Sequence, residues 1–251
     1  MERIIIVSII ATLIVWNLVV WSKILYHLFK IPLTKMLKSE ADDEYIAAAR
    51  RNIKRLVRSE QTRKCVDSTK IFYSDLSKGV GGQFLYSTLG TMILIDQGSA
   101  NRQNVIEHEL LHAVDRHLGI TKSRSLKGVR LRERSERVDW LMNRFGSSLE
   151  EAEGFVDATE KEREYWTSDD ELFATLNGLR LYMLKRGILK RQRDLITSDS
   201  IARILDEVRR DGTTRYDFFT MLSFVGTDRE TDFVRINGVF EMIDSILVNN
   251  I

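Results

Sequence analysis

His108-Glu109-Leu110-Leu111-His112 is the stretch that decides the fold of this chain. Apolar residues recur at helical spacing around it and Gly119 follows as a helix stop, so a buried helix is expected here. Residues four apart on a helix lie one turn above each other, so both imidazoles project from one face with Glu109 beside them. Two neutral imidazoles at this spacing can hold a zinc ion, and the glutamate can then serve as general base. The stretch therefore predicts one Zn²⁺ per chain and hydrolysis of peptide bonds without a covalent intermediate.

The alternative is that the two histidines fell on a core helix by chance. The chain has only 4 His, and three of them, at positions 108, 112 and 117, lie in this one helix, which favours the metal site. His117 lies about 180° round the helix from His108 at about 100° per residue, so we expect it to point elsewhere.

The motif does not fix the third protein ligand. A second helix is expected to begin after Ser168, and Glu171 in its first turn could reach the metal from the facing side. Ser168 and Glu171 also have the spacing of a capping box, in which Glu171 would accept from the Ser168 backbone instead. Asp169 and Asp170 are alternative ligands, favoured by the helix dipole.

Two motifs together carry a resemblance to a known family. The run from His108 to Asp115, and Glu171-Leu172-Phe173-Ala174, resemble the lethal-factor-like zinc metallopeptidases of the gluzincin group, which share the HExxH helix. The resemblance covers about residues 70–185. It implies a zincin-like domain in which His108, His112 and Glu171 bind zinc and Glu109 is the base. It also implies a tyrosine before the third ligand that stabilises the tetrahedral intermediate, and Tyr165 is the nearest candidate.

Short strands are expected before the motif helix, at residues 71–73, 83–86 and 90–96, separated by glycines. The strand at 90–96 is our candidate for an edge strand on which an extended substrate pairs, and an ordinary buried strand is the alternative. The predicted fold class is therefore α+β and helix-dominated, with a small sheet before the HExxH helix.

The N-terminal part predicts a membrane anchor. Residues 4–21 carry no charge and, extended to Leu25, are long enough to cross a bilayer as a helix. No small-x-small cleavage site follows, which favours an uncleaved anchor over a signal peptide. Only Arg3 precedes the segment as a basic residue, whereas lysines follow it up to residue 38, so the C-terminal bulk is expected in the cytoplasm.

The predicted organisation begins with a transmembrane anchor at 1–25, which contacts the bilayer through residues 4–25, and a juxtamembrane amphipathic and basic helical segment at 26–66. A zinc metallopeptidase domain at 67–190 and a helical C-terminal subdomain at 191–251 follow. Net charge is only +2, and the basic residues near position 50 alternate with apolar ones, so nucleic acid is not an expected partner. The predicted function is a membrane-anchored, single-pass zinc metalloendopeptidase that acts on protein or peptide substrates. The alternatives are a membrane-anchored structural or adaptor protein with a non-catalytic zincin fold, and a zinc-stabilised binding domain.

Overall fold

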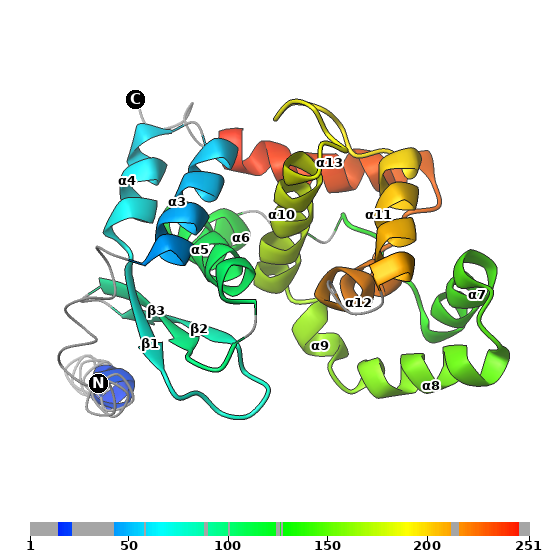
Figure 1. The fold of residues 1–251 in the computed structure, drawn as a ribbon, viewed down its shortest axis with the longest axis horizontal. Helices are drawn as coiled ribbons and strands as arrows, with labels where there is room; N and C mark the ends of the chain where they lie inside the picture. Colours follow the sequence, from blue (N-terminus) through cyan, green and yellow to red (C-terminus); the bar gives the residue numbers. More distant parts are fainter. Residues whose placement is uncertain are drawn as a thin grey trace, which may run out of the picture.

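The computed structural model describes residues 15–21, 43–57, 59–87, 90–99, 101–123, 126, 128–211 and 216–245. Within these ranges the chain is a helix-dominated α+β fold with a small three-stranded sheet, as the sequence predicts (Figure 1). The elements on the side of the sheet are α3 (Glu44–Leu56), α4 (Glu60–Ser68), β1 (Lys70–Ser74), β2 (Gly82–Ser87), β3 (Gly90–Asp96), α5 (Arg102–Leu118) and α6 (Ile120–Ser123). The remaining elements are α7 (Arg134–Phe145), α8 (Leu149–Glu160), α9 (Arg163–Trp166), α10 (Asp169–Lys185), α11 (Ser198–Asp211), α12 (Tyr216–Phe224) and α13 (Glu230–Ser245).

The strand order in the sheet is β1-β3-β2. β3 pairs in parallel with β1 and antiparallel with β2, so β3 is the central strand and β2 is an edge strand. The prediction that residues 90–96 form the edge strand is therefore wrong. The physical reason is burial, because Ile93, Leu94 and Ile95 are all 0% exposed and a strand covered on both faces belongs inside a sheet.

Helix α5 lies at the centre of this half of the molecule. It packs against β2 and β3, and also against α3, α4 and α10. Its buried apolar residues include Ile106, Leu110 and Val114, and it ends at Gly119, whose φ of 63° is the left-handed conformation that closes many helices. The core thus fixes α5 on several sides and leaves one stripe to face a cleft.

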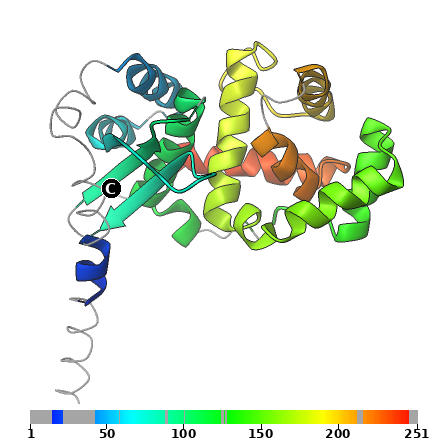
Figure 2. The same ribbon diagram turned by 60° about the horizontal axis from the view of Figure 1, so that its bottom comes forward.

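Helix α10 stands between the sheet-bearing part and the helices α7, α8, α11 and α12 (Figures 1 and 2). The second half is held together by arginines that tie the segment before α7 to the end of α12. Arg132, only 1% exposed, donates to the carbonyl of Leu222 at 2.7 Å. Arg130 contacts the buried Asp232 of α13 at 3.1 Å. These contacts satisfy carbonyls and carboxylates that would otherwise be buried without donors.

The structure corrects the prediction of a transmembrane helix. In the parts of the chain that the structure describes, no helix is both long enough and apolar enough to cross a membrane. Of the predicted anchor only residues 15–21 are described, as a short helix (dark blue in Figure 2), and the rest of residues 1–25 lies outside the described residues. Two further predictions depended on that helix: the bilayer contact through residues 4–25 and the single-pass placement with a cytoplasmic catalytic domain. Without the helix, neither prediction is supported. Within the segment 26–66, described from residue 43 on, α3 and α4 pack against α5.

Candidate metal centre

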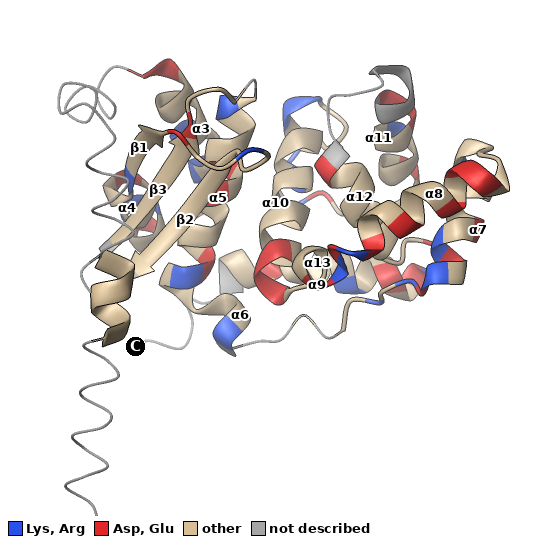
Figure 3. Ribbon diagram, turned by 90° about the horizontal axis from the view of Figure 1, so that it is seen from below, with Lys and Arg blue, Asp and Glu red and all other residues tan. Residues whose placement is uncertain are grey.

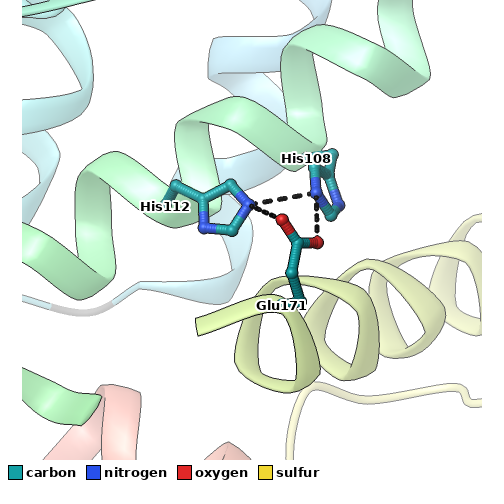
Figure 4. A group of neighbouring side chains, drawn as sticks. All are labelled: His108, His112 and Glu171. Atoms are coloured by element: carbon teal, nitrogen blue, oxygen red, sulfur yellow. Dashed lines mark hydrogen bonds and ion pairs between the residues drawn. The ribbon is translucent and has the colours of Figure 1, made fainter. Parts of the chain in front are cut away.

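The side chains of His108 and His112 on α5 and of Glu171 on α10 point toward one another (Figure 4). The two Nε2 atoms lie 3.1 Å apart. Glu171 places Oε2 3.2 Å from Nε2 of His108 and Oε1 3.3 Å from Nε2 of His112. Ligand atoms arranged tetrahedrally around zinc at the usual bond lengths lie about 3.3 Å from one another. The three side chains therefore fit a single zinc ion, and among the described residues they form the one such group of three or more potential ligands.

One carboxylate oxygen of Glu171 is placed where a bound cation would fit. Oε2 is buried and accepts no hydrogen bond, which is costly for a carboxylate unless a positive charge faces it. Burial alone would raise the pKa of Glu171, but the imidazoles of His108 and His112 outweigh it and hold that pKa at about 2. The carboxylate is thus negatively charged and directed at two nitrogen atoms, which is the donor set that zinc prefers.

The first turn of α10 contains the residues for which the sequence left alternative roles open. Ser168 does precede the helix, but it forms no capping box with Glu171, because its hydroxyl donates to the carbonyl of Tyr165 at 2.9 Å. Asp169 accepts from the backbone N–H of Leu126 at 3.2 Å. Asp170 lines the cleft without joining the three-residue group. Of the acidic residues considered, only Glu171 joins the two histidines in a group that could hold a metal ion.

Glu109 lies beside the histidine pair, on the side of the sheet. It is 7% exposed, and the backbone N–H of Phe84 in β2 donates to its carboxylate. Burial raises the pKa of Glu109, while the neighbouring His108 and His112 lower it in part. A carboxylate with a raised pKa takes a proton more readily, which suits a general base.

Gly82 provides the space that Glu109 occupies. A Cβ atom at Gly82 would lie 2.9 Å from both Cγ and Oε1 of Glu109 and 2.6 Å from Cγ1 of Val105, closer than such atoms normally approach. Any larger residue at this position would displace the glutamate. The sequence analysis placed Phe84 in a predicted strand and Gly82 just before it, but did not assign either of them to the site. The Gly81-Gly82 pair at the start of this strand is a usable signal, because glycine in a strand often marks a close backbone approach.

The three ligands open onto a cleft of about 780 Å³. Gly82 and Phe84 of β2 and Tyr165 and Trp166 of α9 are among the residues that line it. Tyr165, the residue expected to stabilise the tetrahedral intermediate, lines this cleft, and burial followed by the charge of Glu171 raises its pKa. A tyrosine whose pKa is raised keeps its hydroxyl proton and can donate it to an anionic oxygen.

His117 is exposed and lies outside the ligand group, as its angular position on the helix predicts. The buried Asp115, one turn from the ligands, has a structural role instead. Its carboxylate accepts from the backbone N–H and the hydroxyl of Thr121 at 2.9 and 2.7 Å, which ties α5 to α6.

No family model, no curated protein and no solved structure matches this chain. The resemblance of the two motifs to the gluzincin group therefore remains a prediction from the sequence, and the function has to be argued from the geometry of the site.

Proposed function

We propose that the protein is a zinc metallopeptidase that hydrolyses peptide bonds in protein or peptide substrates. His108, His112 and Glu171 hold the zinc ion, and Glu109 acts as general base. The observation that carries this proposal is the convergence of three potential ligand side chains in a cleft.

A zinc ion at such a site acts as a Lewis acid that makes water more acidic and polarises a carbonyl. Glu109, held by the Phe84 N–H, accepts the proton of the attacking water and later donates it to the leaving amine. Tyr165 donates a hydrogen bond to the oxygen that becomes negative in the tetrahedral intermediate.

The number of ligands supports a catalytic rather than a structural site. Structural zinc ions are held by four protein side chains, whereas catalytic ones keep an open position. The described residues supply three ligands, and the group faces a cleft rather than a closed core. A purely structural site would also not require a buried carboxylate at Glu109.

Strand β2 is the surface on which we propose that the substrate binds. In Figure 3 it is the strand nearest α10, and it lines the cleft from Gly82 to Phe84. The backbone N–H of Asp96 donates to the Gly81 carbonyl at 2.8 Å, and hydrogen-bonded pairs alternate along an antiparallel ladder. Gly82 and Tyr86 therefore direct their backbone groups away from β3, and so does the Phe84 carbonyl, whereas the Phe84 N–H is taken by Glu109. An extended peptide can add to the remaining groups at this edge of the sheet.

The test is Glu109→Gln in the full chain, with Glu150→Gln on the exposed face of α8 as matched control. Zinc content is measured together with cleavage of fluorescently labelled casein. We expect Glu109→Gln to retain one zinc per chain and its melting temperature but to lose cleavage, while the control retains both. Undiminished cleavage by Glu109→Gln would exclude it as the base, and a folded wild-type protein that takes up no zinc would overturn the proposal.

A further inference from the structure

The helical stripe that carries the two histidines continues to Arg116. His108, His112 and Arg116 are spaced four residues apart on α5, so they lie on the same side of the helix. A second hollow of about 650 Å³ includes Arg116 and shares Phe84 and His112 with the main cleft. The groove below β2 therefore extends past the metal site as far as Arg116.

The edge strand fixes the position of the Arg116 side chain. Its guanidinium carbon lies 4.0 Å from the ring centroid of Tyr86, two residues beyond Phe84 on β2. A guanidinium that stacks on a ring in this way keeps the N–H groups along its edge available, and these groups match a carboxylate with two parallel hydrogen bonds. Arg116 is thus held beside the strand that we propose as the substrate platform.

Arg116 forms no ion pair within the described part of the fold. Arg132 pairs with Asp228 at 2.9 Å and Arg137 with Glu160 at 2.5 Å, but no described carboxylate lies within ion-pair distance of Arg116. Lys122 lines the same hollow and adds positive charge.

Acidic residues line this hollow too, and two of them already accept hydrogen bonds from neighbouring groups. Asp115 is engaged by Thr121, and Asp169 accepts from the N–H of Leu126. Asp170 acts electrostatically on both His112 and Asp115. Positive charge in the hollow comes from Arg116 and Lys122, which are therefore the groups that can attract an acidic side chain of a peptide in the groove.

We propose that Arg116 is a specificity residue that selects substrates with an acidic side chain about two residues from the cleaved bond, on the Tyr86 side. Four residues of helix separate Arg116 from His112 by about 6 Å, which corresponds to about two residues of extended peptide. This inference rests on the proposed peptidase function, because it takes the groove under β2 as the substrate site.

The experiment measures peptide binding separately from cleavage. Zinc-loaded Glu109→Gln protein is titrated against rhodamine-labelled, terminally blocked decapeptides of Ala, Leu and Gln that carry one central Glu, Lys or Gln. A peptide with a single charge can shift along the groove until that side chain reaches Arg116. The same titrations are made with Arg116→Glu added and, as a control for the same change in net charge, with Arg51→Glu on the exposed side of α3.

We expect the Glu peptide to bind about fivefold more tightly than the Gln peptide, as for a partly exposed ion pair. Arg116→Glu should reverse the order so that the Lys peptide binds best, and Arg51→Glu should leave the order unchanged. Equal binding of all three peptides, an order that Arg116→Glu does not reverse, or no binding at all would overturn the inference.

Cleavage by the wild-type protein distinguishes this inference from the proposed function. If the wild type binds the Glu peptide through Arg116 but cleaves none of the three, the peptidase proposal fails and the binding role of Arg116 stands. If it cleaves all three at equal rates, Arg116 is not a specificity residue and the peptidase proposal stands.

Discussion

Gly82→Ala should impair the catalytic base without removing the metal. The added Cβ would lie 2.9 Å from Oε1 of Glu109 and 2.6 Å from Cγ1 of Val105. Ordinary contacts begin near 3.5 Å, so the carboxylate has to retreat by about 0.6 Å and the valine methyl by roughly 0.9 Å. A displacement of about 1 Å in a catalytic group can cost about 100-fold in rate, so we expect kcat to fall about tenfold. The zinc ligands extend from other positions and should hold one zinc as before.

The assay compares kcat, KM and zinc content of wild type, Gly82→Ala and Gly81→Ala on a peptide that the wild type cleaves. Gly81→Ala is the matched control, since its added Cβ has its nearest neighbours in Val105, at 3.2 Å, and Ser99. We expect a lower kcat for Gly82→Ala alone, with KM little changed. A Gly82→Ala protein with normal kcat would refute the steric reasoning, and one that has lost its zinc would show that the damage extends to the ligands.

Three further outcomes are expected. Adding zinc to metal-free protein should stabilise the fold by about 2.7 kcal/mol when free zinc is at a hundred times its Kd, and the melting temperature should rise accordingly. His112→Ala should abolish this rise. Glu171→Ala should weaken zinc affinity in a competition titration, whereas Asp170→Ala should leave it nearly unchanged; equal losses would reassign the ligand. Asp232→Asn should lower the free energy of unfolding in urea at pH 7 by about 1–2 kcal/mol, because hydrogen bonds from Arg130 outweigh burial and hold the pKa of Asp232 below its usual value. A carboxyl with a lowered pKa stabilises the fold above its unfolded-state pKa, so this deficit should shrink as the pH falls below about 4.

The motif helix was predictable because its evidence is local. The apolar period, the i and i+4 histidines and the Gly119 stop all act within the helix itself, so no tertiary information is needed to place His108 and His112 on one stripe. The small sheet before it followed from local strand signals in the same way. These features depend on the backbone of one segment and on which of its faces is apolar.

The order of the strands depends on contacts between segments. β1 pairs with β3, although β2 lies between them in the sequence. Nothing in the sequence of β1 indicates which strand it will join. The burial pattern does contain a usable signal, since Ile93-Leu94-Ile95 is a continuous apolar run, which is typical of a strand covered on both faces. In β2, by contrast, Gln83 and Tyr86 are exposed. Choosing residues 90–96 as the edge strand ignored that difference.

The role of Glu171, the proposed third ligand, could not be predicted from the local sequence. Ser168 and Glu171 satisfy a capping-box pattern, and the same glutamate also fits the first turn of a metal-bearing helix, so the sequence supports both roles. A cap contributes about 1 kcal/mol, which is small compared with the packing of α10 through Leu172, Phe173 and neighbouring buried residues. Packing against α5 therefore sets the direction of the Glu171 side chain, and the Ser168 hydroxyl bonds to the Tyr165 carbonyl instead. Because the cap is the weaker requirement, a glutamate at this position can leave it to complete the site on the facing helix.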